Sequence, residues 1–197
     1  MFSYCFQVNK RVGKPPKVSP REDDDTEPIV CQCKSDADRP CGVDEDCFNR
    51  LTLIECDPSR CNAGDKCQNR RFRKREYSKV QPFKTESRGW GLKALQDLKK
   101  GTFVIEYVGE LIDEAECESR IKNMIEKHEP NFYFLTIDRD TIIDAGPKGN
   151  LARFMNHSCS PNCETQKWVV GGVTRVGLFA IQDIPQGKFI IKLSFYI

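Results

Sequence analysis

A run of eleven residues, Arg153–Cys163, brings amide, imidazole, hydroxyl and thiol groups together beside segments that are typical of strands. The Asn156 amide can both donate and accept hydrogen bonds, and the His157 imidazole can also bond a ligand. The Cys159 thiol is free to ligate a metal ion. These residue types predict a site that binds a polar cofactor.

A second group of side chains that could do chemistry consists of seven cysteines: Cys31, Cys33, Cys41, Cys47, Cys56, Cys61 and Cys67. Their segment has short loops and few strand-length apolar runs, so hydrophobic burial alone would not hold it. Thiolates at such spacings favour structural zinc, and seven of them complete two tetrahedral sites if one sulfur bridges both ions. Disulfides are the alternative, which the odd count and an N-terminal stretch without secretory features disfavour.

The two groups occur in an order that resembles a known family, the SET-domain protein lysine methyltransferases. Three further segments match the SET pattern, namely Arg88–Gly91, Glu106–Glu110 and Gly149–His157. The cysteine array looks like the AWS (associated-with-SET) zinc module. Two more segments, Asp144–Gly149 and Glu164–Trp168, narrow the resemblance to the nuclear-receptor-binding SET-domain (NSD) branch.

This resemblance implies the fold class. We expect a mainly β protein: a SET-domain fold of small curved β-sheets with a threaded (pseudoknot) segment and one clear helix, plus a zinc-stabilised, loop-rich AWS module. Residues 1–28 would be an irregular leader, 29–78 the AWS module and 79–197 the SET domain. The likeness fails after Gly187, so we expect a SET domain truncated at its C-terminus, without a post-SET segment and without a metal on Cys159.

The elements expected to position these groups follow from local patterns. Strands are expected at 103–108, 132–137, 141–143 and 174–180, with hairpin turns at 138–140 and at Gly171–Gly172. A helix is expected from Asp113 to Lys127, with Asp113 and Glu116 as a capping box. Its apolar face would hold Cys117, Ile121, Met124 and Ile125.

Composition limits the class of protein. The net charge is +2. A composition of 39% hydrophobic and 30% charged residues excludes a membrane-spanning segment. The chain is long enough for one ordinary core and a small satellite domain.

By resemblance, the methyl donor is S-adenosylmethionine, bound by three segments. Their residues are Arg88, Gly89 and Trp90, then Pro130, Asn131, Phe132 and Tyr133, and finally Asn156 and His157. His157 could be a general base, but a hydrogen-bonding role on the adenine side is favoured, and Arg153 is expected to be a structural tie. Gly89 and Gly91 would allow close backbone approach.

Methyl transfer to an amine requires a lysine that has lost its proton, held in line with the donor. A narrow aromatic channel would lower the pKa of that lysine by desolvation. Candidates to line it are Tyr107, Phe132, Tyr133, Phe154 and Phe179, and ordinary core packing is the alternative for each.

The candidate catalytic residues are Tyr133, Tyr107 and Tyr196. The family's last strand reads Gly-x-Glu-Leu-Thr-Phe-Asn/Asp-Tyr, whereas this chain reads Gly187-Lys-Phe-Ile-Ile-Lys-Leu-Ser-Phe-Tyr-Ile197. Ser194 therefore stands at the tyrosine position, and Tyr196 lies about 6 to 7 Å further along the same strand face.

The resemblance also implies the zinc ligands and the partners. Cys41 would bridge two structural ions, with Cys31, Cys33 and Cys47 on one and Cys56, Cys61 and Cys67 on the other. The substrate would be the histone H3 tail, at the lysine in position 36, on nucleosomes in nuclear chromatin. The basic run Arg70–Arg75 could add DNA phosphate contacts, and we expect a monomer.

Two other classes of function remain open. One is a catalytically weak or inactive, zinc-stabilised chromatin-binding module. The other is a purely structural zinc protein, which would not need Arg88–Gly91 and Asn156–Cys163 together. Affinity for S-adenosylmethionine separates them.

Overall fold

Most of the chain is built from strands in two sheets. The structure is a computed structural model that describes residues 9–12, 30–43, 46–86, 89–129 and 131–192. The smaller sheet has the order β1-β5-β7-β6, formed by Lys10–Arg11, Glu110–Ile112, Thr141–Asp144 and Phe134–Asp138. The prediction of a mainly β protein is confirmed.

The larger sheet has the order β2-β3-β11-β9-β10-β4, and β8 also pairs with β11. Its strands are β2 (Val80–Lys84), β3 (Trp90–Ala94), β4 (Phe103–Tyr107), β8 (Asn156–His157), β9 (Cys163–Val170), β10 (Val173–Ala180) and β11 (Phe189–Lys192). Strand β11 pairs antiparallel with β3 and parallel with both β8 and β9. The last described strand is thus inserted among segments that are far apart in the sequence.

Local turn chemistry sets the long β9–β10 hairpin. Gly171 and Gly172 have φ angles of 60° and 78°, the left-handed region that glycine tolerates without strain. Asp138 closes the β6–β7 turn by accepting a hydrogen bond from the Asp140 amide at 2.9 Å. Both predicted turns are confirmed.

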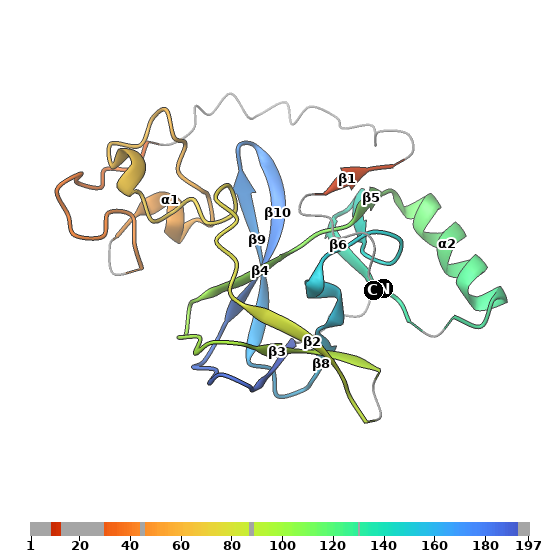
Figure 1. Cartoon of the computed structure of the whole chain (residues 1–197). Helices are drawn as coiled ribbons and strands as arrows, with labels where there is room; N and C mark the ends of the chain where they lie inside the picture. Colours follow the sequence, from red (N-terminus) through yellow and green to blue (C-terminus); the bar gives the residue numbers. More distant parts are fainter. Residues whose placement is uncertain (1–8, 13–29, 44–45, 87–88, 130, 193–197) are drawn as a thin grey trace.

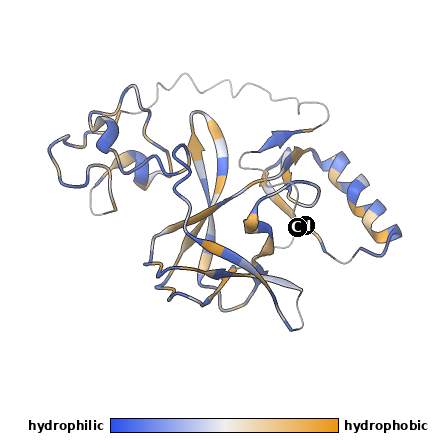
Figure 2. Cartoon of the chain, in the orientation of Figure 1, coloured by the Kyte–Doolittle hydropathy of each residue, from blue (hydrophilic) through white to orange (hydrophobic). Residues whose placement is uncertain are grey.

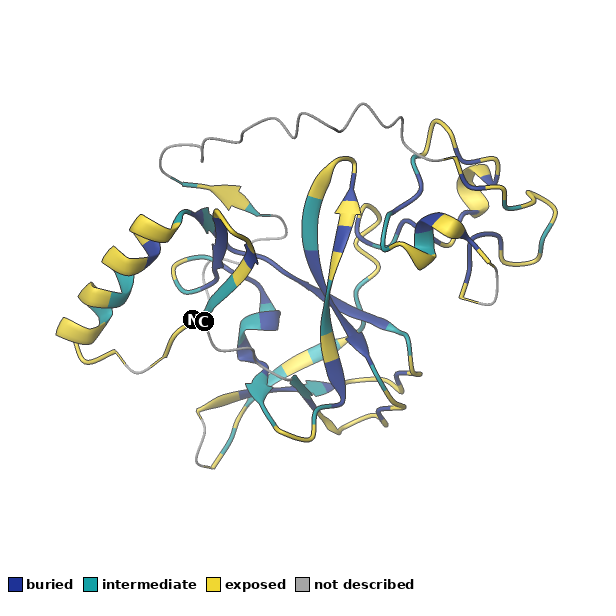
Figure 3. Ribbon diagram, turned by 180° about the vertical axis from the view of Figure 1, so that it is seen from behind, coloured by how far each residue is buried: buried dark blue, intermediate teal, exposed yellow. Residues whose placement is uncertain are grey.

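The predicted helix is α2, Glu114–Glu126. Asp113 caps it by accepting a 2.8 Å bond from the Glu116 amide, while the Glu116 side chain accepts from Arg120 instead of completing the box. Cys117 is buried as expected, but Ile125 is 60% exposed. The end of the helix extends away from the sheets, so only its first turns have a surface to cover (Figure 3).

Residues 30–75 form a loop-rich module whose helices are the single turns α1 (Phe48–Leu51) and η1 (Gly64–Lys66). It lies on the opposite side of the large sheet from α2 (Figure 1). Hydrophobic residues are concentrated in the strands rather than in this module (Figure 2).

The main core lies in the sheets and includes Leu92, Val104, Ile143, Leu178 and Ile190, each at most 1% exposed. A separate aromatic cluster of Phe72, Phe103, Trp168 and Phe179 packs where the cysteine-rich module meets β4, β9 and β10. A further short 3-10 helix, η2 (Leu151–Phe154), leads into β8.

One part of the leader is regular. Lys10 and Arg11 form β1, which pairs parallel with β5, and the Lys10 amide donates to the Gly109 carbonyl at 3.0 Å. The expectation of an irregular leader is therefore wrong at these residues, because the edge of β5 offers backbone groups that need partners. Across the described ranges, every helix falls short of the length and apolarity that a bilayer crossing requires.

Candidate active site and cysteine cluster

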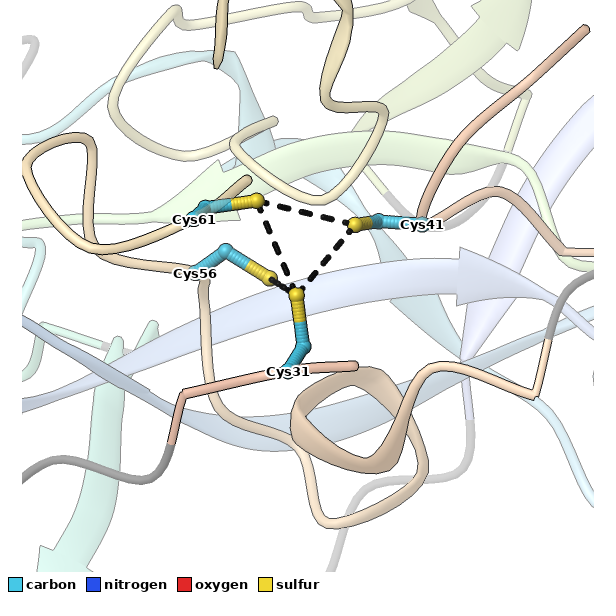
Figure 4. A group of neighbouring side chains, drawn as sticks. All are labelled: Cys31, Cys41, Cys56 and Cys61. Atoms are coloured by element: carbon cyan, nitrogen blue, oxygen red, sulfur yellow. Dashed lines mark hydrogen bonds between the residues drawn. The ribbon is translucent and has the colours of Figure 1, made fainter. Parts of the chain in front are cut away.

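The seven array cysteines converge in one cluster inside the loop-rich module. The Cys31 sulfur lies 3.6 Å from those of Cys41 and Cys61 and 3.8 Å from that of Cys56 (Figure 4). A disulfide requires about 2.05 Å, so these contacts are not disulfides. Sulfurs about 2.3 Å from one zinc ion would be about 3.8 Å apart at the corners of a tetrahedron. The distances therefore fit tetrahedral metal ligation.

The sulfurs form two overlapping groups of four. Within each group, all four sulfurs lie within 4.8 Å of one another. One is Cys31, Cys33, Cys41 and Cys47, and the other is Cys31, Cys41, Cys56 and Cys61. The first equals the ligand set expected for one ion. The second contains Cys41, Cys56 and Cys61 of the other expected set, with Cys31 in place of Cys67. Cys31 and Cys41 belong to both groups, so either sulfur has the position of a shared ligand.

The sulfurs accept hydrogen bonds from neighbouring polar groups. Asn69 donates from its side chain to the Cys56 sulfur at 3.4 Å, and its amide donates to the Cys67 sulfur at 3.4 Å. Hydrogen bonds from Cys47 and Cys67 lower the pKa of the Cys56 thiol, whereas burial raises that of Cys31 to about 12. Crowded thiols cannot all ionise without a compensating positive charge, which a metal ion supplies.

The module is joined to the large sheet through buried polar and aromatic contacts. Buried Glu55 accepts a 2.6 Å bond from the Phe72 amide, and Ile54 forms a parallel bridge with Val169 of β9. The Arg71 guanidinium lies 4.9 Å from the Phe179 ring centroid and 5.3 Å from that of Trp168. These contacts fix the module against β9 and β10.

A cavity of about 470 Å³ opens at this junction. Its walls include Arg39, Arg50, Arg71, Lys99 and Lys100, with Glu76 as an acidic member. None of the predicted cofactor residues that the structure describes lines it. The described parts of those segments gather elsewhere, around η2 and β8.

The first predicted cofactor segment contacts the third. The Asn156 side-chain amide donates to the Trp90 carbonyl at 3.1 Å, across 66 positions of sequence. The Trp90 indole is 43% exposed, and its ring lies 6.1 Å from that of Phe154. Gly89 has a φ of 68°, so the tight turn before Trp90 requires glycine.

The second predicted segment is tied to the same place by Tyr107. This buried tyrosine donates its hydroxyl to the Tyr133 carbonyl at 2.9 Å. The Arg153 guanidinium stacks on the Tyr133 ring with its carbon 4.2 Å from the ring centre. Burial raises the pKa of Tyr107 well above its ordinary value, so the hydroxyl stays protonated and acts as a donor.

The structure describes some of the remaining predicted site residues and not others. Asn131 and Phe132 are exposed beside Tyr133, and His157 follows Asn156 in β8, with its ring nitrogen 3.9 Å from the Cys159 sulfur. Arg88, Pro130, Ser194 and Tyr196 lie outside the described residues.

Two interpretations are corrected. Phe179, a candidate for the acceptor channel, instead packs 5.7 Å from Trp168 and 5.1 Å from Phe103 in the junction cluster. The space beside the Gly91 Cα is filled by Phe83 of β2, because a Cβ there would lie 2.7 Å from the Phe83 ring. Its missing side chain serves sheet packing.

The sequence interpretation also missed the buried polar ties that support the site. Glu106, fully buried, accepts two bonds from Arg175 and a 3.0 Å bond from the Tyr77 hydroxyl. The Asn150 side chain donates to the Glu106 carbonyl at 2.7 Å, which links this network to η2. A charged residue inside the otherwise apolar 103–108 strand was the available signal, since buried charges are nearly always paired.

A second missed tie holds β11. The Asn162 side chain donates to the Phe189 carbonyl at 2.7 Å and accepts from the Ile191 amide at 3.0 Å. A third holds α2, where Arg120 pairs with Glu110 at 2.8 Å and with Asp144 at 2.6 Å. Each partner is distant in sequence, so spacing gave no indication of it.

The basic run 70–75 is not one solvated face. Arg70 is 6% exposed, and Arg71 is stacked on the junction aromatics. Arg73, Lys74 and Arg75 are exposed. Only this second half of the run can meet a phosphate without rearrangement.

Comparison with known proteins finds the same two units. The SET domain family matches residues 89–191, more than half of the chain, and the AWS domain family matches residues 37–75. The human protein named "Histone-lysine N-methyltransferase, H3 lysine-36 specific" is 56% identical over 182 residues, which cover 92% of this chain and 7% of that protein. Mouse "Histone-lysine N-methyltransferase NSD3" is 55% identical over 182 residues, which cover 92% of this chain and 12% of that protein.

Solved structures agree with these matches. A Chaetomium thermophilum polycomb repressive complex 2 superposes with a TM-score of 0.76 at 27% identity, covering 83% of this chain and 23% of that one. The same complex "in an autoinhibited conformation bound to S-adenosylmethionine" gives 0.68 at 30% identity, covering 75% and 21%. The expected resemblance is confirmed: with its SET and AWS domains, this chain belongs to the SET-domain family, among relatives that include NSD3.

Proposed function

We propose that this chain is a protein-lysine N-methyltransferase that transfers a methyl group from S-adenosylmethionine to the lysine at position 36 of histone H3 on nucleosomes. The observation that carries the proposal is the convergence of the three predicted cofactor segments. The Asn156–Trp90 bond joins the first and third, and the Tyr107–Tyr133 bond fixes the second. The relatives named as H3 lysine-36 specific supply the substrate.

The residues at this convergence fit S-adenosylmethionine. The Arg153 Nε atom is buried without a hydrogen-bond partner at a site lined by Tyr133 and Phe154, and a polar ligand group would satisfy it. The exposed Trp90 indole offers a π face to a cation. Gly89, Trp90, Asn131, Phe132, Tyr133, Asn156 and His157 would hold the cofactor, together with Arg88 and Pro130.

When bound, S-adenosylmethionine supplies an electrophilic methyl group. The chain's own residues bind it and orient the acceptor: Asn156 fixes the Trp90 segment, and Tyr107 holds the Tyr133 carbonyl in place. The buried face of Tyr107 excludes water from the acceptor side, which favours a neutral amine. We assign Tyr107 and Tyr133 as the acceptor-side catalytic residues, with Tyr196 as a third candidate.

We further propose that the cysteine cluster holds two structural zinc ions, with Cys41 as the bridging ligand. All ligand positions would be filled by sulfur, so the ions would stabilise the module rather than react. The sulfur separations of 3.6 to 3.8 Å support this assignment.

The proposed partners are the H3 tail and, through Arg73, Lys74 and Arg75, DNA phosphates of the nucleosome, with the chain acting as a monomer in the nucleus. We retain the division into a leader (1–28), an AWS module (29–78) and a SET domain (79–197) as part of this proposal. The whole-length relatives are far longer than this chain.

The test is transfer of labelled methyl to recombinant nucleosomes, beside nucleosomes whose H3 carries arginine at position 36. Label that disappears with the arginine supports the proposal. Asn156→Ala should abolish transfer and weaken cofactor binding, whereas Asn123→Ala on the exposed side of α2 should change neither. Failure of the wild-type chain to bind S-adenosylmethionine would overturn the proposal.

One alternative has an observation in its favour. Strand β11 carries Phe189, Ile191 and Lys192 where the family pattern has Glu, Thr and Phe. A chain that binds the cofactor without labelling H3 would be a catalytically weak chromatin-binding module.

A further inference from the structure

Lys192, the last described residue of β11, directs its amine into the proposed acceptor side. Its Nζ atom lies 4.8 Å from the centre of the Tyr107 ring. Its backbone is in register with His157 of β8 and with Cys163 of β9. The residue thus lies beside the third cofactor segment and ends on the buried tyrosine that fixes the second.

The Tyr107 ring is a fixed surface rather than a mobile contact. It is 3% exposed, and its hydroxyl is held by the Tyr133 carbonyl at 2.9 Å. Lys192 is itself partly buried. An amine placed on this face is therefore held close to the residues assigned to the cofactor.

Desolvation favours the neutral form of this amine. Burial alone lowers the pKa of Lys192 to about 8. Lys99 shows the contrasting case, since its 2.7 Å bond to Asp183 raises the pKa of an exposed lysine. Lys192 is accordingly a better nucleophile at neutral pH than a solvated lysine.

The position of this lysine differs from the family pattern. Counted from Gly187, Lys192 occupies the place where the family's strand carries phenylalanine. Where that pattern has an aromatic residue, this chain has a lysine, the chemical class of the proposed substrate.

We propose that Lys192 is a methyl acceptor within its own chain, methylated by S-adenosylmethionine bound at the adjoining site. This inference rests on the proposed function. The lone pair of neutral Nζ attacks the methyl carbon of the sulfonium as the carbon–sulfur bond breaks. The bonding electrons remain on sulfur, which leaves in S-adenosylhomocysteine, and the new methylammonium releases a proton to water.

Because donor and acceptor belong to one complex, the reaction is intramolecular. Its rate per chain should not depend on protein concentration, unlike transfer between chains. Lys192 and an H3 lysine would use the same methyl donor, so we expect the two acceptors to compete.

The test is incubation of the purified chain with S-adenosylmethionine alone, followed by digestion and mass spectrometry of the peptide that contains Lys192. We expect methylation at Lys192 with a first-order rate unchanged by tenfold dilution. Lys192→Arg should lose this mark, whereas Lys188→Arg, in the exposed turn before the same strand, should keep it. An unmethylated Lys192 in a chain that binds the cofactor, or a rate that falls on dilution, would overturn the inference.

A second variant separates this inference from the proposed function. Lys192→Phe restores the family residue, and we expect it to bind S-adenosylmethionine and to label H3 several-fold faster than wild type. If it labels H3 while wild type never methylates Lys192, only the Lys192 inference fails. If neither chain binds the cofactor, the proposed function fails with it.

Discussion

The cysteine-rich module and the two sheets reach an ordered fold by different physical means. In the sheets, residues such as Val104, Ile143 and Leu178 are fully buried and supply apolar burial. In residues 30–75 the buried cluster consists of cysteines and Ala63, with little apolar area to remove from water. The first region is stabilised by apolar burial that does not require a bound metal ion, whereas the second depends on what its sulfurs bind. The sheets should therefore tolerate metal loss that the module does not.

Loss of zinc should produce the largest difference in stability between the module and the sheets. Structural zinc in small domains contributes about 10–16 kcal/mol of apparent binding free energy, so Cys41→Ser should unfold the module. Hydrogen exchange should show lost protection in residues 46–75 while β9 and β10 keep theirs, and elemental analysis should show fewer zinc ions per chain. Cys159→Ser, at an exposed thiol, should keep the full zinc content. Equal loss of protection in both regions would show that they fold as one unit.

Phe72→Ala tests the contact between the regions. Phe72 is 1% exposed and lies 4.5 Å from Phe103 and 5.9 Å from Trp168, so its removal leaves a cavity that costs about 3–5 kcal/mol. Urea denaturation should detect the loss. The matched control is Phe48→Ala on α1, whose ring is 51% exposed and should cost far less. Similar losses for both variants would show that Phe72 does not anchor the junction between the module and the sheets.

The pH dependence of Lys192 methylation tests the sheet side. The folded pKa of about 8 lies below the ordinary value of 10.5, so the neutral amine grows as pH rises through 8. The neutral fraction rises about tenfold from pH 7 to pH 9, and the methylation rate should follow. In the same chain, stability should increase with pH between about 8 and 10.5, since the unfolded state binds more protons there.

The control for this profile comes from the titratable neighbours of Lys192. The Tyr107 ring lies against the amine, and His157 and Cys163 are the strand partners of Lys192 in β8 and β9. Burial raises the pKa of Tyr107 and that of Cys163, the latter to about 12. Neither should ionise between pH 7 and pH 9. A rate that keeps rising through pH 10 would place the Lys192 pKa at its solvated value.

The smallest effect is expected at the N-terminal cap of α2, directly after β5 of the small sheet. Asp113→Ala removes the 2.8 Å cap on α2 and should cost about 1 kcal/mol. Thermal unfolding should detect this shift, while Asp140→Ala in an exposed turn should give less. A loss as large as that of Phe72→Ala would mean that α2 carries more of the fold than its exposure indicates.

Features decided by neighbouring residues could be predicted from the sequence. The Asp113 cap, the two-glycine turn and the array of cysteines each depend on local spacing, and each is found. The short strand β1 was missed because two residues carry no pattern of their own and pair only with a remote edge. Phe179 was misplaced because an aromatic residue in a strand does not reveal which cluster its face meets.

For the candidate site, too, some features could be predicted from the sequence and others could not. The residues of its three segments could be named, because a resemblance transfers identities. Their ties could not, since Glu106 meets Arg175 across 69 positions and Asn156 meets Trp90 across 66. The Lys192 amine was likewise unpredicted, because only the threading of β11 brings it to Tyr107.

The insertion of β11 has a consequence for how the protein is made. Strand β11 joins β3, β8 and β9, so the large sheet keeps an unfilled gap until these residues have left the ribosome. Pairing of this kind must wait for long-range closure and is slow compared with local structure. A nascent chain that pauses before Phe189 would expose the apolar edges of β3 and β9 to other chains. Chaperones that shield strand edges would then act on this protein until β11 has emerged and paired.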